Sequence, residues 1–433
     1  MMIGGSSIMT VAHVLPAPAV ATNRSVAAAV IGNAMEWYDF AVYGFFASVI
    51  GKLFFPTSEP SLSVIAALGV FAVGFLMRPI GGIMFGYIGD RYGRTFSLFL
   101  SIGAMACGTL AMGLLPTYET AGMLAPVLMI TCRIVQGLAV GGEYATSIVV
   151  LVESAPVHRR GFRGSLACLG ATAGNLLGSA TGAVLFHNLD ENQIAGWGWR
   201  IPFVMGVGVA MAGIYLRRKF TAEDCAARNS TRRFFRIVLS QWPAVLRVAG
   251  INIVAAIGFY MIFVYLVQYI VEFSHVGEAK ALTINSMNMA VLMFIIPAAG
   301  HTSDIVGRKA MMLTALSLLI LCSLPLFELL QSGDEILVFT AQLGFTVILG
   351  CYLGTIPAVL AEQFPAEVRC TGSATSYNLV HGVFGGTTPM VCALMISASG
   401  NNLLPALYLS IAAAIALATV CLVRETAFRE LRA

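Results

Sequence analysis

Long apolar stretches recur along the whole chain and are separated by short polar segments. Each stretch has about 20 residues or more, which is the length that an α-helix needs to cross the hydrocarbon core of a bilayer. Only 11% of the 433 residues are charged, whereas a soluble protein carries about a quarter. A surface that faces water cannot be built from this composition. The chain is therefore predicted to be an all-α polytopic membrane protein.

We expect twelve spans, and the most polar segment of the chain falls between the sixth and the seventh. The spans lie at about 26–50, 62–88, 95–115, 121–151, 163–187, 199–217, 244–271, 281–303, 310–330, 335–361, 371–398 and 403–423. Accordingly, the predicted domains are a tail (1–25), a six-helix bundle (26–217), a central loop (218–243), a second six-helix bundle (244–423) and a tail (424–433).

The loops on the two sides of the predicted bundle differ in charge. One set carries Arg91, Arg94, His158, Arg159, Arg160, Arg163, Arg308, Lys309, Arg369 and Arg424, and the other set holds little beyond Lys52 and Lys280. Because Lys and Arg accumulate in cytoplasmic loops, the first set is predicted to be cytoplasmic. This orientation places both tails in the cytoplasm, in a multi-pass protein of a bacterial-type inner membrane.

A charged loop motif occurs twice, once in each half. Gly86, Asp90, Gly93 and Arg94 match Gly300, Asp304, Gly307 and Arg308, all at a separation of 214 residues. The residues Glu153, Pro156 and Arg160 likewise match Glu362, Pro365 and Arg369 at a separation of 209 residues. Duplicated halves with binding at their interface are a recurrent plan of transporters. The repeat therefore predicts two pseudo-symmetric bundles.

The repeated loop has the residues of a gate. Its glycines let two helices turn and approach closely, and its aspartates can accept charge-assisted hydrogen bonds from an arginine or a helix start. Such contacts can hold one conformation and release another. The gating candidates are Gly86, Asp90, Arg91, Gly93, Arg94, Asp304 and Arg308, although the same residues would also serve only to make the turn and fix topology. The second copy has Ile305 where the first has Arg91.

Four further segments carry a family resemblance. They are residues 32–40 (GNAMEWYDF), 78–82 (RPIGG), 136–144 (with GGEY at its end) and 196–203 (GWGWRIPF). Together with the Gly-Asp-Arg-Gly-Arg loop they resemble the metabolite:proton symporter family of the major facilitator superfamily. That family includes proline/betaine transporters and alpha-ketoglutarate, shikimate and citrate permeases. The resemblance implies a twelve-helix major facilitator fold and proton-coupled transport.

Several ionisable residues lie inside the predicted spans of the first half, where each costs several kcal/mol unless it is paired or hydrated. Glu36 and Asp39 are three residues apart and so share a helix face. Two carboxylates close together in a low dielectric do not both ionise easily, so one is expected to take up a proton near neutral pH. With Glu143 they are the proton-coupling candidates. A structural pairing with arginines is the alternative.

The fourth span carries a predicted polar stripe. Arg133, Gln136, Val140 and Tyr144 follow helical spacing and are expected to face a cavity, where Arg133 holds a substrate carboxylate or balances an internal carboxylate. Arg78 is expected to be structural and to neutralise Asp39 or Glu143.

Aromatic and polar residues complete the substrate-binding candidates. Trp37 and Tyr43 would receive a quaternary ammonium by cation–π attraction, and Tyr260, Asn378 and His381 are the candidates in the nearly uncharged second half. The other amides there, at Asn252, Asn285, Asn288 and Gln342, are as readily explained by helix packing.

The sequence predicts a transporter and no enzyme. No phosphate-binding loop, nucleophile elbow or metal-ligand cluster is visible, so no catalytic residue, metal or cofactor is expected, with protons as the coupling ion. The expected partners are a small-molecule substrate, protons and the bilayer, without nucleic acid or an obligate protein partner.

The leading hypothesis is proton-coupled uptake of a small organic acid, such as a di- or tricarboxylate or alpha-ketoglutarate. The membrane arginines favour it, as does a chain end about ten residues after the last span, where osmosensing proline/betaine members carry a long heptad-bearing tail. The alternatives are proton symport of a zwitterionic osmolyte (proline or glycine betaine) and a proton-driven efflux antiporter.

Overall fold

The computed structural model describes residues 23–92, 94–140, 143–208, 211 and 241–431, and every regular element in these ranges is a helix. Gly93, almost all of the predicted first tail and nearly all of the predicted central loop lie outside the described residues.

In the first half, the first four helices form two consecutive pairs, and a single residue separates the two helices of each pair. Its elements are α1 (Asn23–Phe45), α2 (Ala47–Phe54), α3 (Pro60–Leu76), α4 (Arg78–Tyr92), α5 (Arg94–Leu114), α6 (Tyr118–Ala121), α7 (Leu124–Ala139), α8 (Glu143–Glu153), η1 (Val157–Arg159), α9 (Arg160–Asn188), α10 (Glu191–Gly196) and η2 (Gly198–Arg200). Residues 201–208 continue as helix.

The second half contains two helices interrupted by a π-helical turn. Its elements are α13 (Trp242–Tyr260), η3 (Met261–Tyr265), α14 (Leu266–Phe273), α15 (Glu278–Val306), α16 (Arg308–Leu330), α17 (Glu335–Glu362), α18 (Arg369–Val380), η4 (His381–Gly385), α19 (Thr388–Ser399) and α20 (Leu404–Leu422). The turns η3 and η4 are the π-helical segments.

These helices fall on the predicted spans. Within the described residues, nine helical stretches are long and apolar enough to cross a membrane. Three predicted spans remain. The first corresponds to α1 with α2 and the third to α5, and residues 201–208 form the helical start of the sixth. The chain is therefore an all-helical membrane protein, as its apolar periodicity predicts.

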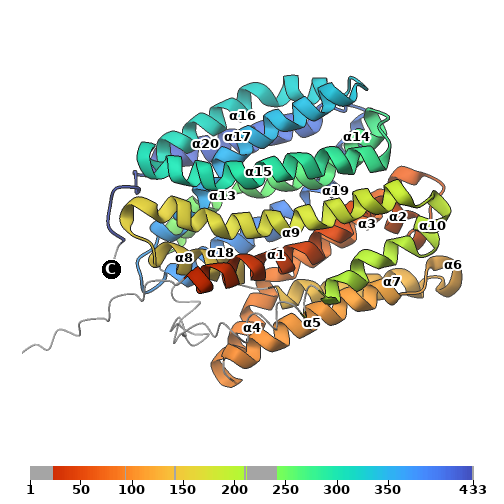
Figure 1. The fold of residues 1–433 in the computed structure, drawn as a ribbon, viewed down its shortest axis with the longest axis horizontal. Helices are drawn as coiled ribbons and strands as arrows, with labels where there is room; N and C mark the ends of the chain where they lie inside the picture. The colour runs from red at the N-terminus through yellow and green to blue at the C-terminus, as the bar shows by residue number, and fades with distance from the viewer. Residues whose placement is uncertain (1–22, 93, 141–142, 209–210, 212–240, 432–433) are drawn as a thin grey trace, which may run out of the picture.

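The two halves meet along α9 and α15, which lie side by side through the middle of the bundle (Figure 1). Small residues allow this approach: a Cβ atom added to Gly161 would lie 2.3 Å from the carbonyl oxygen of Gly300. We call the end that contains Gly300–Arg308 and the tail after Leu422 the motif end, and the other the opposite end.

The helix α13–η3–α14 is the most enclosed of the nine candidate spans. In its most apolar window 89% of the residues are buried, compared with 33–50% in the others. Its neighbours come from both halves, because it contacts α1 as well as α17, α18 and α20. This helix therefore brings second-half side chains to the interface.

Candidate functional site

Arg78 and Glu36 form a buried ion pair between α4 and α1. Arg78 is the first residue of α4 and is 2% exposed, and its Nη2 donates to Glu36 Oε1 over 3.1 Å. Its guanidinium carbon also lies 5.2–5.4 Å from the ring centres of Trp37, Phe40 and Phe75. Rings stabilise a desolvated cation through their quadrupoles. The pair and the rings together offset the cost of burying this charge.

Arg133 lies in a second aromatic setting nearby. It is fully buried, and its guanidinium carbon lies 4.1 Å from the ring centre of Tyr43 and 5.2 Å from those of Phe40 and Phe71. Nη1 donates to Gln136 Oε1 over 2.8 Å. Phe40 thus contacts both guanidinium groups, so the two arginines belong to one site.

Close helix packing brings these arginines together. A Cβ on Gly137 of α7 would lie 2.0 Å from the carbonyl oxygen of Gly74 on α3, and one on Gly81 would lie 2.0 Å from that of Leu138. Only glycine allows two helix backbones this close. The α3–α4 helix therefore contacts α7 directly.

Asp39 is buried beside this cluster, and its environment differs from that of Glu36. Within the described part of the chain, its Oδ1 has no hydrogen-bond partner. A Cβ on Gly206 would lie 2.6 Å from this oxygen and 2.9 Å from Thr109 Cγ2. Arg133 is near enough to act on Asp39 electrostatically. Asp39 is therefore a buried carboxylate with an open acceptor.

An aromatic layer continues from this cluster into the second half. Trp37 stacks on Tyr260 with ring centres 6.3 Å apart and meets Tyr144 edge-on at 5.7 Å. Tyr144 in turn lies 4.8 Å from Tyr377. Tyr260 also meets Phe75 at 5.0 Å. Rings from α1, α8, α13 and α18 therefore line the boundary between the halves.

His381 is the last member of this aromatic layer and the first residue of the π turn η4. Its ring stacks on Tyr377 with centres 3.8 Å apart, and its Nδ1 lies 3.3 Å from Asn252 Nδ2 and 3.2 Å from the Tyr377 carbonyl oxygen. A single π turn inside an α-helix often marks a functional position.

The cluster offers donors for an anion and rings for a cation. In the described residues, Nε and Nη1 of Arg78 and Nε and Nη2 of Arg133 have no hydrogen-bond partner. Guanidinium groups of this kind bind a carboxylate. The adjoining rings of Trp37, Tyr144 and Tyr260 are suited to an ammonium group. A small molecule that carries both groups matches both features.

Most of the predicted substrate and proton residues meet in this layer. Trp37, Tyr43, Arg133, Gln136, Tyr144, Tyr260 and His381 are all buried there with Glu36 and Asp39. Asn378 is buried on α18, one turn before His381. Glu143 is half-buried at the first position of α8.

Two predicted details are wrong. The stripe on the fourth span is not one helix, because α7 ends at Ala139 and Val140 leaves the helical conformation (φ −95°, ψ 82°). Tyr144 accordingly lies on a separate helix, α8. The predicted partners of Arg78 were Asp39 or Glu143, but the structure pairs it with Glu36. Spacing along one helix does not show which residue of another helix Arg78 meets.

Some residues of the site were not predicted. The rings of Phe40, Phe71 and Phe75 surround the arginines. Tyr377 stacks on His381. The hydroxyl of Thr109 accepts a hydrogen bond from Gln136 Nε2 over 2.7 Å. Phe71 and Phe75, and also Tyr377 and His381, are four residues apart and share a helix face. That spacing was the available signal.

The second copy of the repeated loop joins the halves at the motif end. Asp304 accepts hydrogen bonds from the main-chain N–H groups of Gly161 (2.8 Å) and Phe162 (2.9 Å), at the start of α9. Arg308 donates to Asp304 (2.7 Å) and to Glu362 (3.2 Å). Because α9 belongs to the first half and α15 to the second, the two bonds of Asp304 join the halves at this end.

Gly307 makes the turn of this loop, as predicted. Its φ of +104° is in the region that favours glycine. In the first copy, Arg91 is exposed and donates to the hydroxyl of Tyr87 over 2.8 Å. Gly86, Asp90 and Arg94 lie on α4 and α5, but their side chains, like Gly93, are outside the described part of the structure.

A second set of contacts across the motif end comes from the other repeated loop and the tail. Arg369 donates to Glu153 of the first half. Arg160 donates to the main-chain oxygen of Arg429 over 2.8 Å, and Thr426 donates to Glu362 over 2.6 Å. The tail after α20 therefore contacts both halves.

Glu425 attaches this tail to the start of α16. Burial acts to raise the pKa of Glu425, but main-chain N–H groups of Ala427, Lys309, Arg308 and Thr426 outweigh it and hold the pKa below its usual value. The Arg308 and Lys309 bonds measure 3.0 and 2.9 Å. Capping a helix start with a carboxylate is favourable.

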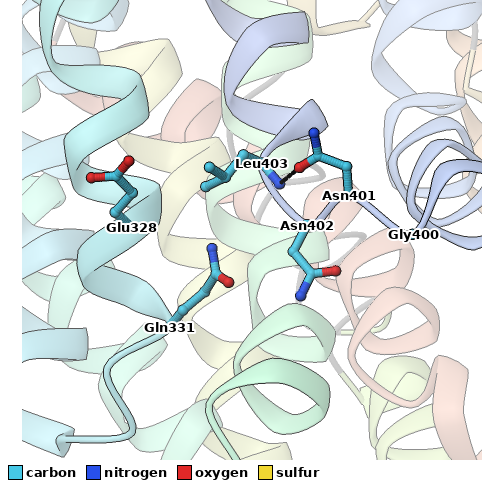
Figure 2. A pocket seen from close by; sticks show the side chains of 6 residues that line it. All are labelled: Glu328, Gln331, Gly400, Asn401, Asn402 and Leu403. Atoms are coloured by element: carbon cyan, nitrogen blue, oxygen red, sulfur yellow. Dashed lines mark hydrogen bonds between the residues drawn. The ribbon is translucent and has the colours of Figure 1, made fainter.

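A separate pocket opens at the opposite end. It has a volume of about 470 Å³ and lies between the end of α16 and the α19–α20 connection; Figure 2 shows its lining of Glu328, Gln331, Gly400, Asn401, Asn402 and Leu403. None of these residues belongs to the aromatic layer. We therefore place the candidate substrate site in the layer and not in this pocket.

Residues 29–389 match the family model of the Major Facilitator Superfamily. The chain is 34% identical to the proline/betaine transporter of Escherichia coli K12 over 424 residues, which cover 94% of this chain and 85% of that protein. It is also 34% identical to the glycine betaine/proline/ectoine/pipecolic acid transporter OusA of Dickeya dadantii, over 94% of this chain and 84% of that protein.

Solved structures share the fold. A crystal structure of a D-xylose-proton symporter superposes with a TM-score of 0.72 at 18% identity, covering 94% of this chain and 99% of that one. The xylose transporter XylE from E. coli, in a partially occluded inward open conformation, gives 0.70 at 16% identity, with 92% and 97% covered.

Proposed function

Because the chain belongs to the Major Facilitator Superfamily, whose members are transporters, we propose that it takes up a small zwitterion of the betaine or proline type together with a proton. The transport would proceed by alternating access, with the two halves rocking about the central layer. This proposal replaces a di- or tricarboxylate as the leading candidate substrate.

The observation that carries the proposal is the balance of buried charge. Arg78 and Arg133 supply two positive charges, and Glu36 and Asp39 can supply two negative charges. With both carboxylates ionised, a zwitterion adds no net charge to this set, whereas a dicarboxylate adds two negative charges that no further cation of the layer balances among the described residues. Uncompensated charge is costly inside a membrane protein. The site therefore suits a neutral molecule with separated charges.

The arrangement of donors and rings supports the same class. The carboxylate of a betaine would bind an open guanidinium edge, and its quaternary ammonium would lie against Trp37, Tyr144 and Tyr260. The curated relatives named as proline/betaine transporters, identical at about a third of positions over most of the chain, support it too.

Asp39 is the proposed proton carrier. It is buried with one oxygen unpaired, and a proton would remove the cost of its charge. Glu36 is instead paired with Arg78. If the proton on Asp39 weakens its attraction for Arg133, that guanidinium becomes free for the substrate carboxylate, which couples the two binding events.

The open guanidinium groups also favour the second candidate, a small organic acid. A single carboxylate would be accommodated as well as that of a betaine, but each further carboxylate would need another cation. Proton-driven efflux is the third candidate. A cationic drug would have to displace or neutralise the two arginines, so the site favours it least.

We further propose that the motif end faces the cytoplasm of a bacterial inner membrane, because the basic loops gather there. The bonds of Asp304 and Arg369 would then form the cytoplasmic gate. Protons would be the coupling ion, and we propose no other cofactor, nucleic acid or obligate protein partner.

Uptake by purified protein in liposomes tests the proposal. Labelled glycine betaine, proline and alpha-ketoglutarate are offered with and without an imposed inside-alkaline pH gradient. We expect accumulation of betaine or proline that depends on the gradient. Accumulation of alpha-ketoglutarate alone would support the organic acid, and drug export with no uptake of any of the three would support efflux.

A further inference from the structure

The turn η3 of the central helix is held by two buried amides from neighbouring helices. We propose that Asn285 and Gln342 are positioning residues that fix this π turn and thereby set the place of Tyr260 in the substrate site. The turn itself is independent of what the protein transports, while the effect on the substrate rests on the proposed function.

Both amides bond to main-chain oxygens of the turn. Gln342 Nε2 donates to the carbonyl oxygen of Ile262 over 3.1 Å, and Asn285 Nδ2 donates to that of Phe263 over 3.2 Å. Gln342 Nε2 also donates to Asn285 Oδ1 over 2.8 Å. Both side chains are fully buried. The two amides therefore form one unit that spans α15, α17 and η3.

These bonds have a clear physical role. A π turn widens the helix to i→i+5 bonding, here from Leu266 N–H to Met261 oxygen, so that ordinary α-helical pairing is disturbed. A buried carbonyl oxygen left without a donor costs about 1–3 kcal/mol. If the amides are removed, the turn loses the partners that favour it over a regular α-helix. Closing to α geometry rotates one side of the helix against the other by about one residue, or about 100°.

The turn adjoins the substrate site on two sides. Tyr260, which stacks on Trp37, is the residue directly before it. Val264, inside the turn, packs on α1 so closely that a Cβ on Gly44 would lie 2.8 Å from Val264 Cγ1. A rotation here would therefore change how Tyr260 meets α1.

The amide pair also reaches the first half. Ser179 Oγ of α9 accepts from Asn285 Nδ2 over 3.0 Å and from Ser286 Oγ over 2.9 Å. When the halves separate at this level, the bonds to Ser179 break while those to the turn stay within the second half. Asn285 thus links the contact between halves to the turn beside the site.

The test compares Asn285→Ala and Gln342→Ala with the matched control Asn288→Ala. Asn288 is also fully buried and lies one turn further along α15, and its Nδ2 donates to the Ile284 oxygen of its own helix and to Gln342 at 3.5 Å. Among the described residues, Asn288 makes no hydrogen bond to the turn. General loss of packing should affect the control as well.

Hydrogen–deuterium exchange of peptides over 258–268, in protein reconstituted in nanodiscs, is the first readout. We expect exchange about tenfold faster in the two variants and unchanged in the control, the effect of one lost hydrogen bond to a buried group. Equal exchange in all variants would overturn the inference.

The second readout is KM for glycine betaine, proline or alpha-ketoglutarate, whichever the wild type takes up. We expect KM to rise by about tenfold with little change in the maximal rate, since Tyr260 binds and does not gate. Faster exchange with an unaltered KM would overturn the positioning role. If the wild type takes up neither glycine betaine nor proline, the proposed function fails, while exchange still decides whether the amides hold the turn.

Discussion

Arg78 donates to Glu36 over 3.1 Å with both side chains almost completely buried. The pair connects α4 to α1. An ion pair of this kind is costly to break from one side, because the remaining partner becomes a buried charge without compensation.

Neutralising one member of this pair should destabilise the protein more than neutralising both. Arg78→Gln or Glu36→Gln should each cost about 3–5 kcal/mol, and the double variant should regain a large part of that loss. Thermal unfolding in detergent across the four proteins measures the cycle. Losses that simply add would show that the two side chains do not depend on each other.

Asp39→Asn should uncouple transport from the proton gradient. The amide keeps the shape of Asp39 but cannot carry a proton, so uphill accumulation in liposomes should be lost while exchange of external for internal substrate continues. The half-buried Glu143 serves as the comparison, and Glu143→Gln should keep uphill accumulation. If Asp39→Asn still accumulates substrate against a gradient, another carboxylate carries the proton.

Trp37→Leu should weaken binding of a quaternary ammonium substrate. The expected loss is about 0.5–2 kcal/mol, equivalent to a rise in KM of about 2- to 30-fold. Phe54→Leu is a suitable control, because Phe54 is equally buried against Trp199 but lies outside the layer. Equal effects of both variants on KM would argue for general loosening and against a cation site at Trp37.

Asp304→Asn should loosen the motif end, because one carboxylate accepts two N–H groups of the other half. We expect faster hydrogen–deuterium exchange in residues 157–166 and 298–308. Asp334→Asn is the comparison, since Asp334 is exposed and caps α17 within its own half through Ile336 and Leu337. Unchanged exchange after Asp304→Asn would show that other contacts close this end.

The helices could be predicted from the sequence because each span in lipid must satisfy the hydrogen bonds of its own main-chain polar groups and present apolar side chains to the bilayer. That constraint leaves a continuous apolar signal, and the described helices follow the predicted spans closely. The charged residues of the site were recognisable for a related reason, since an ionisable group inside a span needs a partner. Glu36, Asp39, Arg78 and Arg133 were identified in this way.

The pairing of these residues could not be predicted. The sequence pointed to a continuous fourth helix, but the chain leaves helical geometry at Val140. The π turns that begin at Met261 and His381 are likewise not signalled by spacing within one helix; at the first of them, amides from two other helices donate to carbonyl oxygens of the turn. The aromatic surroundings of the arginines arise from the approach of α3 to α7 at Gly137, and one sequence alone gives no measure of that distance.

The membrane arginines of the sequence favoured the dicarboxylate, although Arg78 was expected to neutralise an internal carboxylate. In the structure Arg78 is paired with Glu36, so its charge is compensated inside the site by a different carboxylate from the two that were predicted.

The sign of the transport current tests the central claim most directly. A zwitterion carried with one proton moves one positive charge per cycle, whereas a dicarboxylate carried with one proton moves one negative charge. Proteoliposomes on a solid-supported membrane should give a current of inward positive charge when glycine betaine or proline is added, abolished by Asp39→Asn. A current only with alpha-ketoglutarate, or none with either zwitterion, would contradict the account.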